Sequence, residues 1–385
     1  MILLLQFKIL TLCSLWRPSN WKSLWFKIPY DILTVLTTIC MCILTLLQFL
    51  YIILLVENSD DLTGCVFLSL TVFSVAVKMI HVLKARKDIQ RLVHIFTSEP
   101  FAPTNENEII IQQDYDRQIR KSTIIYGSAV ESTVATTILK SFLFEVKDKQ
   151  LPFRAWYPSD YIATWNFFAL AYIHQVYSFV VGSFIDIAYE TLICGFMMQI
   201  CAQFEILKHR MQQLVNEQGN RSDHQKNIII NCVRHHNLIY QCSKNIVDVF
   251  SGVIGVQFFV SSLVLCTTMF QIVQKDLMSM QALSLVLYLN SLFVQIFIYC
   301  WFGNEVLLSV SLERNLSYEI GDAIYKIDWT MLEVDTQKGL IMMMNRSMKP
   351  IQITTASIIS LNLDSFTTLV KMSYSAFNLL QKSQN

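Results

Sequence analysis

The chain has 385 residues, of which 53% are hydrophobic and only 15% are charged, and its formal net charge is +1. A soluble domain usually carries about a quarter of charged residues, so this composition excludes an ordinary soluble domain. Two windows contain no charged residue, one between Asp31 and Glu57 and the other between Asp276 and Glu305. Each is longer than the roughly 20 residues that cross a hydrocarbon core. The sequence therefore predicts a multi-pass helical membrane protein, with membrane lipid as a partner and no nucleic acid.

The first segment, Met1 to Leu15, is apolar and superficially resembles a signal peptide. Gln6 and Lys8 interrupt it, and Trp16-Arg17-Pro18 follows where a cleavage site would need small residues. We therefore expect a cytosolic segment that lies at the membrane interface.

Hydropathy predicts seven membrane spans in chain order. They cover approximately 32–56, 62–83, 122–144, 165–200, 250–274, 278–303 and 351–380. The expected fold class is all-α, with one seven-helix domain over residues 1–385. The fourth and fifth spans are expected to continue as helices beyond the membrane, over 205–215 and 228–249. No internal repeat is found, which argues against a transporter built from inverted halves.

Lys and Arg residues are distributed unevenly between the predicted loops. Most lie in the N-terminal arm and in the loops after the second, fourth and sixth spans. Because these residues concentrate on the cytosolic side, we expect a cytosolic N-terminus and an extracellular C-terminus. A G-protein-coupled receptor has its seven spans in the opposite orientation, so that class is excluded.

Motifs for catalysis and cofactor binding are missing. The sequence has no nucleotide-binding glycine loop, no paired-histidine metal motif and no Gly-x-Ser-x-Gly elbow. His235 and His236 are adjacent, and we expect them on a solvated helix face. The ten cysteines form no CxxC motif and are expected to be reduced. We therefore expect neither an enzyme nor a cofactor.

Several charged residues nevertheless fall within predicted spans: Lys78, Glu131, Lys140, Asp186, Glu190, Asp364 and Lys371. Such charges are costly in lipid and normally face protein or water. Ion pairing within the bundle explains these charged residues at least as well as a catalytic site within the membrane does. We expect Lys78 to extend toward the interface, and Asp186 and Glu190 to lie near the inner interface.

Aromatic and hydroxyl side chains gather where the outer halves of several spans should meet, with the loop from Glu145 to Trp165 as a candidate cap. A mostly apolar pocket with a few polar groups suits a small volatile or lipophilic ligand. Ordinary helix packing and interfacial aromatic residues are the alternative explanation. The candidate ligand-binding residues are Val72, Phe73, Thr136, Thr137, Tyr172, Gln175, Tyr177, Phe179, Tyr288 and Phe293.

The last predicted span carries polar residues at helical spacing: Ser357, Asp364, Thr368, Lys371, Ser375, Asn378 and Lys382. This spacing places them on one face of a helix. Lipid cannot satisfy such a face, so it must meet water or protein. The pattern indicates a helix that lines an aqueous path.

From the end of the sixth span the sequence resembles the C-terminal signature of insect odorant receptors. The N-terminal Leu15-Trp16-Arg17-Pro18 is similar to the start of that family as well. The matching C-terminal residues are Phe302-Gly303-Asn304-Glu305, Ala323-x-Tyr325, Trp329, Gln337-Lys338, Met343, Arg346-Ser347-x-x-Pro350, Thr354, Ser360-Leu361-x-Leu363, Phe366 and Lys371-x-Ser373-Tyr374-Ser375.

The resemblance implies a ligand-gated, non-selective cation channel in the plasma membrane of a sensory neuron. Such a subunit binds a small hydrophobic odorant and assembles with an odorant co-receptor as a heterotetramer. The family's co-receptor has a longer loop between the fourth and fifth spans, so this chain is expected to be a tuning subunit. Within the single domain, 32–200 and 278–303 would form the ligand-binding bundle, and 201–250 and 304–385 the cytosolic anchor and pore region.

The family's gate lies near the outer end of the last helix, and its positions correspond here to Phe377, Leu380 and Gln381. That face is offset by one residue, about 100°, from the polar face through Lys371 and Asn378, so both sets are candidates for the pore. The alternatives are an insect gustatory receptor-type channel and a multi-pass transporter. Ser365-Phe366 and Met372-Ser373 stand where the gustatory family has Thr-Tyr and Gln-Phe, which argues against the former.

Overall fold

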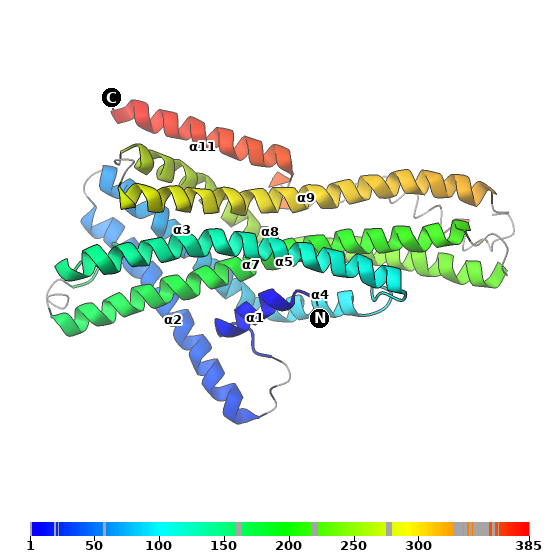
Figure 1. Ribbon diagram of the computed structural model, residues 1–385, viewed down its shortest axis with the longest axis horizontal. Helices are drawn as coiled ribbons and strands as arrows, with labels where there is room; N and C mark the ends of the chain where they lie inside the picture. Colours follow the sequence, from blue (N-terminus) through cyan, green and yellow to red (C-terminus); the bar gives the residue numbers. More distant parts are fainter. Residues whose placement is uncertain are drawn as a thin grey trace.

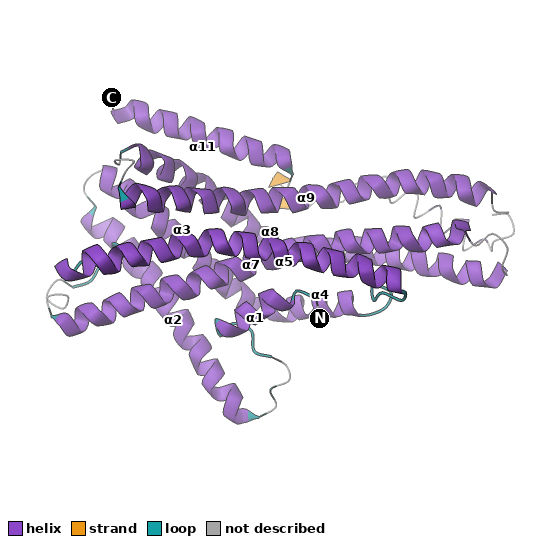
Figure 2. Cartoon of the chain, viewed as in Figure 1, coloured by secondary structure: helices purple, strands orange, loops and turns teal. Residues whose placement is uncertain are grey.

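The computed structural model describes most of the chain. The described residues are 2–18, 21, 23–56, 59–158, 164–216, 222–274, 279–326, 334, 337–338, 341, 354–355, 359–360 and 362–384. The fold is all-α, as the sequence predicts (Figures 1 and 2).

The long helices are α2 (Leu24–Leu55), α3 (Ser59–Lys84), α5 (Glu106–Lys140), α7 (Trp165–Asn216), α8 (Ser222–Val273), α9 (Met280–Lys326) and α11 (Leu363–Gln384). Two short helices, α1 (Leu4–Leu12) and α4 (Arg86–Thr97), complete the bundle. A π-helical turn over Ser141–Glu145 and a 3-10 turn over Val146–Asp148 continue α5. Two antiparallel pairs of residues, β1 (Thr354–Thr355) and β2 (Ile359–Ser360), precede α11.

Helices α5, α7, α8 and α9 run side by side along the long axis of the molecule and extend beyond α3 (Figure 1). The helices α7 and α8 have 52 residues each, which corresponds to about 78 Å. A hydrocarbon core is about 30 Å thick. The predicted helical continuations over 205–215 and 228–249 are therefore confirmed, and the bundle has a long extension outside the membrane.

Six of the seven predicted spans lie on helices, four of which, α5, α7, α8 and α9, extend well beyond the predicted spans. The seventh, 351–380, is wrong at its start, because α11 begins at Leu363. Thr354-Thr355 pairs with Ile359-Ser360 instead, as suits β-branched residues. The helix starts where the Asn362 side chain accepts a hydrogen bond from the backbone N–H of Ser365 at 2.8 Å, which is an N-cap.

Five helical stretches within the described residues are long and apolar enough to cross a membrane by themselves. They are Leu24–Leu55, Leu62–Lys84, Trp165–Gln212, Ile230–Val273 and Ala282–Ser309. The spans on α5 and α11 fall short of that apolarity because both contain many polar residues. Among the five, α2 has the most exposed apolar surface, and it crosses the other helices obliquely (Figure 1).

The N-terminal helix α1 packs against α7 inside the bundle. Leu10 is fully buried, and the Gln6 amide donates to the Thr123 hydroxyl at 2.7 Å. A Cβ at Gly195 would lie 2.3 Å from the side chain of Leu3, so the close contact depends on this glycine. One side of α1 is thus buried against the bundle, whereas Leu4, Lys8 and Leu12 on the other side are exposed, and its place at the membrane interface stays a prediction.

In the extension beyond the membrane, Arg210 on α7 holds the start of α5. Its guanidinium donates to Glu108 at 2.9 and 2.8 Å and to the Pro100 carbonyl at 2.7 Å. Burial favours the neutral form of Glu108, but the hydrogen bonds from Arg210 and Thr104 outweigh it and hold the pKa of that carboxyl below its usual range. The pair therefore remains ionic at neutral pH.

The two adjacent histidines lie next to this pair and are fully buried. His235 forms hydrogen bonds with Gln203 at 2.9 Å and with Arg210 at 3.2 Å. The ring of His236 packs 4.9 Å from that of Tyr240. The expected solvated face is wrong, because α7 and α8 stay packed together past the membrane and this stretch of α8 faces α7.

We predict that Arg210→Met lowers the stability of the chain by about 3 kcal/mol or more, because Glu108 would be left as a buried charge without its cation. The thermal midpoint of unfolding of the purified chain in detergent measures the effect. Lys208→Met is the matched control, since its exposed pair with Glu205 contributes little. Equal midpoints for the two variants would contradict the role of the Arg210 pair.

Candidate functional site

Six helices, α2, α3, α5, α7, α8 and α9, enclose a cavity of about 90 Å³, which we call the chamber. Helix α2 contributes only Met41, and each of the other five contributes side chains that recur at steps of three or four residues and so share one face. Valines make up much of the wall, with Phe179 and Leu292, and hydroxyl and amide groups lie between them. The residues that line it are Met41, Thr71, Val72, Ser74, Val75, Lys78, Tyr126, Val130, Thr133, Val134, Ser178, Phe179, Gly182, Ser183, Asp186, Gln257, Val260, Ser261, Val264, Tyr288, Ser291, Leu292 and Gln295.

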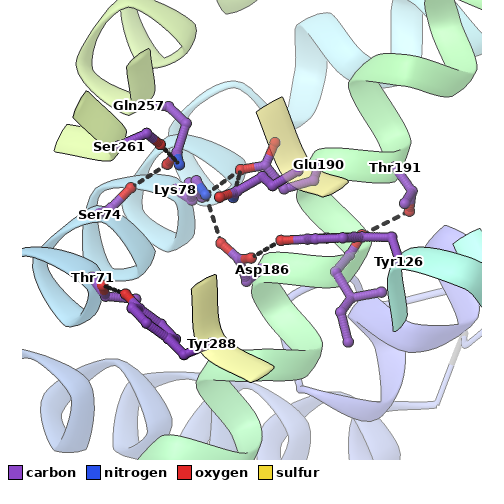
Figure 3. Close-up of polar contacts among 12 residues, drawn as sticks. Thr71, Ser74, Lys78, Tyr126, Asp186, Glu190, Thr191, Gln257, Ser261 and Tyr288 are labelled. Atoms are coloured by element: carbon purple, nitrogen blue, oxygen red, sulfur yellow. Dashed lines mark hydrogen bonds and ion pairs between the residues drawn. The ribbon is translucent and has the colours of Figure 1, made fainter. Parts of the chain in front are cut away.

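One end of the chamber is closed by a group of buried charges (Figure 3). The Lys78 ammonium donates to Asp186 at 2.6 Å and also to Glu190. The Tyr126 hydroxyl donates to the other oxygen of Asp186 at 2.5 Å, and the Gln295 amide donates to Glu190 at 2.8 Å. This charge cluster, Lys78, Asp186 and Glu190 with Tyr126 and Gln295, joins α3, α5, α7 and α9.

The Lys78 side chain is 1% exposed, so the expectation that it extends toward the interface is wrong. Asp186 and Glu190 lie with it inside the bundle, and their depth relative to the inner interface stays a prediction. The physical reason for this burial is that each charge finds an opposite charge on a neighbouring helix, which offsets part of the cost of desolvation. A second polar group joins α3 to α8: Ser74 donates to Gln257 at 2.6 Å, and Gln257 donates to Ser261 at 2.8 Å (Figure 3).

A larger hollow of about 750 Å³, which we call the vestibule, lies beside the segment that connects α5 to α7. Residues 149–155 form one wall, so the predicted cap residues do lie over a cavity. The buried side chain of Gln175 fixes this wall, because its amide accepts from the Phe153 N–H at 3.0 Å and donates to the Phe153 carbonyl at 3.1 Å. Lys140 and Glu145 form an ion pair at 2.8 Å on the same wall.

The chamber and the vestibule share three lining residues, Thr133, Phe179 and Tyr288. The Tyr288 hydroxyl is hydrogen-bonded to Thr71 (Figure 3). Thr133 is hydrogen-bonded to Ser291 at 3.1 Å. The two hollows are therefore neighbours, and the Tyr288 ring lies between them.

The structure brings together four of the ten candidate ligand-binding residues. Val72, Phe179 and Tyr288 line the chamber, and Thr137 lines the vestibule. Phe73 is 37% exposed and packs edge-on against Phe49, because one residue along a helix turns the side chain by about 100°.

The other five candidates line neither hollow. The Tyr177 hydroxyl is hydrogen-bonded to Thr37 on α2 at 3.0 Å, and Gln175 holds the loop. Thr136 donates to the backbone of its own helix, Tyr172 packs on Phe168, and Phe293 packs against the core. Whether any of these ten residues contacts a ligand stays a prediction.

Sequence reasoning missed most of the chamber, although a signal for it exists. On α9, for example, Tyr288, Ser291, Leu292 and Gln295 follow the i, i+3, i+4, i+7 pattern. The same pattern of Ser, Thr and Gln within an apolar span recurs on α3 and α8. Searching each predicted span for such a polar face would have found the chamber, whereas selecting aromatic residues did not.

Helix α11 lies outside the bundle against α8 and α9 (Figure 1). Leu369 and Ser373 face inward, and the Ser373 hydroxyl donates to the Ser262 carbonyl at 3.4 Å. The polar face with Lys371 points away from the bundle. Phe377 and Asn378 are half-buried, whereas the side chains of Leu380 and Gln381 lie outside the described residues.

We predict that Lys78→Met destabilises the chain by about 3 kcal/mol or more, because Asp186 and Glu190 lose their shared cation. The yield of monodisperse protein in detergent and its thermal midpoint are the measurements. Adding Asp186→Asn and Glu190→Gln should restore part of the stability by removing the unpaired charges. Lys84→Met, at the exposed end of the same helix, is the control and should behave as the wild type. A Lys78→Met chain that melts like this control would refute the prediction.

Comparisons with known proteins agree with this architecture. Residues 57–374 match the family model described as 7tm Odorant receptor. Odorant receptor 13a of Drosophila melanogaster is 23% identical over 319 residues, which cover 79% of this chain and 76% of that relative. Odorant receptor 46a, isoform A, of the same organism is 22% identical over 341 residues, which cover 88% of this chain and 86% of that relative. The structure of the olfactory receptor OR5 from Machilis hrabei in complex with eugenol superposes with a TM-score of 0.84 at 16% identity, over 99% of this chain and 97% of that one.

Proposed function

Since this chain belongs to the 7tm odorant receptor family, we propose that it is the ligand-tuning subunit of a ligand-gated, non-selective cation channel. It is a receptor and not an enzyme. The observation that carries the proposal is the chamber, an apolar cavity with a few hydrogen-bonding groups inside a membrane bundle. Such a site suits a small hydrophobic or volatile ligand. The solved OR5 complex contains eugenol, which is a small and mostly apolar molecule with polar oxygen atoms.

In the proposed arrangement the chain lies in the plasma membrane with its N-terminus in the cytosol. The excess of Lys and Arg in the N-terminal arm and in the loops after the second, fourth and sixth spans supports this orientation. The vestibule then faces the outside, and the long extension of α7, α8 and α9 lies in the cytosol. That extension, with 304–385, is the proposed anchor and pore region.

The partner in the proposal is an odorant co-receptor, with which the chain forms a heterotetramer. Helix α7 ends at Asn216 and α8 begins at Ser222, so their connection is short, as in the tuning subunits that the sequence resembles. The outward polar face of α11 supports a pore between subunits, because polar groups in a membrane require water or protein contacts. Phe377, Leu380, Gln381, Lys371 and Asn378 are the proposed pore and gate residues.

The packing also suggests how the chamber acts on the pore. Ser261 lines the chamber, and the carbonyl of the next residue, Ser262, accepts from Ser373 on α11. Phe297 on α9 packs 5.8 Å from Phe366 on α11. A ligand that binds better to the open arrangement of α8 and α9 shifts the equilibrium toward it. Apolar gate residues such as Phe377 then separate and allow the pore to fill with water.

We predict that cells expressing this chain together with the co-receptor show odorant-evoked cation currents, and that the chain alone does not. Whole-cell recording against a broad panel of small volatile molecules is the measurement. Tracer uptake without such currents would support the transporter alternative and overturn the proposal. Currents evoked only by non-volatile tastants would support the gustatory-type channel.

We predict that Val72→Phe, which places a ring in the chamber of about 90 Å³, raises the half-maximal concentration of the larger agonists at least tenfold. Smaller agonists should be affected less, so their ranking changes. Phe73→Leu is the matched control, because the neighbouring side chain points away from the chamber. An unchanged ranking for Val72→Phe would remove the chamber as the ligand site.

A further inference from the structure

The chamber and the vestibule differ in volume so much that they cannot hold a ligand of the same size. A cavity of roughly 150 Å³ accommodates benzene, and ligand pockets usually measure about 300–1,000 Å³. The chamber has about 90 Å³ and the vestibule about 750 Å³. Any ligand larger than benzene therefore cannot be held by the chamber alone with its walls as they stand.

The residue that separates the two hollows, Tyr288, packs against the core, and its side chain has one hydrogen bond. Tyr288 touches both hollows, and its hydroxyl bonds to the Thr71 hydroxyl on α3. Its ring also packs 5.5 Å from that of Phe67, which lines the vestibule. Turning this ring would break one hydrogen bond between neutral groups and would join the hollows. The neighbouring Thr133, by contrast, bonds to Ser291 and to its own helix.

We propose that the vestibule is a first binding site for the ligand and that the Tyr288 ring is the movable barrier between it and the chamber. The ligand class is a small uncharged amphiphile with one hydroxyl or carbonyl group. The apolar part of the ligand passes Tyr288 and packs against the valines of the chamber. Its polar group forms hydrogen bonds with hydroxyl side chains that line the hollows. Ligands longer than the chamber remain partly in the vestibule and hold Tyr288 away from Thr71. The inference rests on the proposed function only in taking the chamber as the ligand site.

The test replaces the ligand by a thiol reagent, so it needs neither an agonist nor the co-receptor. Val134 lines the chamber only, and Val134→Cys makes it a reporter for methyl methanethiosulfonate, a small uncharged molecule. The full-length chain is placed in lipid nanodiscs, and peptide mass spectrometry measures the modification rate at position 134. Tyr288→Ala should raise this rate at least tenfold. Leu285→Trp, which narrows the vestibule on the side of Tyr288, should lower it more than twofold.

Two controls lie on the same helix as Tyr288. Phe293→Ala and Leu283→Trp change side chains that line neither hollow, and both should leave the rate within twofold of that of the reporter chain. A second reporter, Leu285→Cys on the vestibule side, should react equally fast with and without Tyr288→Ala. Tyr288→Phe keeps the ring, removes the hydroxyl and should accelerate modification at position 134 by about two- to fivefold.

A rate at position 134 that no variant changes would overturn the proposal, because the reagent would then arrive between the helices from the lipid. Equal acceleration of both reporters by Tyr288→Ala would also overturn it, since that result indicates general loosening of the bundle. Neither outcome depends on odorant-evoked currents. The absence of such currents with normal labelling would instead refute the proposed channel function.

Discussion

The charge cluster around Lys78 is the interaction on which the arrangement of the bundle depends. One cation on α3 serves two carboxylates on α7, and α5 and α9 supply the hydroxyl and the amide that complete the group. Because none of these charges can leave the low-dielectric interior without its partner, the cluster sets the rotation of four helices about their axes. The chamber is the space that these fixed helices leave next to the cluster. Its position therefore follows from electrostatics, whereas its walls follow from the small and β-branched residues above it.

The length of α7, α8 and α9 links the chamber to parts of the chain far from it. Each helix continues without interruption past the membrane, where the buried Glu108–Arg210 pair fastens α7 to the start of α5. A rigid helix transmits a tilt at one end to its other end, and closely packed interiors deform little. Two of these helices, α8 and α9, pack against α11 on the outer side of the bundle. The chamber walls, the extension beyond the membrane and the proposed pore helix thus belong to one set of closely packed helices.

Much of the fold could be predicted from hydropathy, because long apolar spans can be found in the sequence alone. The start of α11 could not, since hydropathy does not distinguish a short apolar strand from the first turns of a helix, and only the Asn362 cap marks where the helix begins. Lys78 shows a different limit. A lone cation in a span has no partner within reach along the sequence, and only the packing of α3 on α7 supplies one. His235 and His236 were misplaced for the same reason. The site was predicted least well: Val72 and Phe73 are adjacent, and only the rotation of α3 decides which of them reaches the chamber.

The oblique, lipid-facing helix α2 has a consequence for the setting in which this receptor operates. Its charge-free part, from Ile32 to Leu55, is about 36 Å long at 1.5 Å per residue, somewhat more than the roughly 30 Å of a hydrocarbon core. Such a helix adjusts its tilt to the thickness of the bilayer. Met41, which is on this helix, is part of the chamber wall and lies near Gly182 of α7. Because a change in the tilt of α2 moves Met41, we expect the shape of the chamber to depend on the thickness of the bilayer and therefore on its lipid composition.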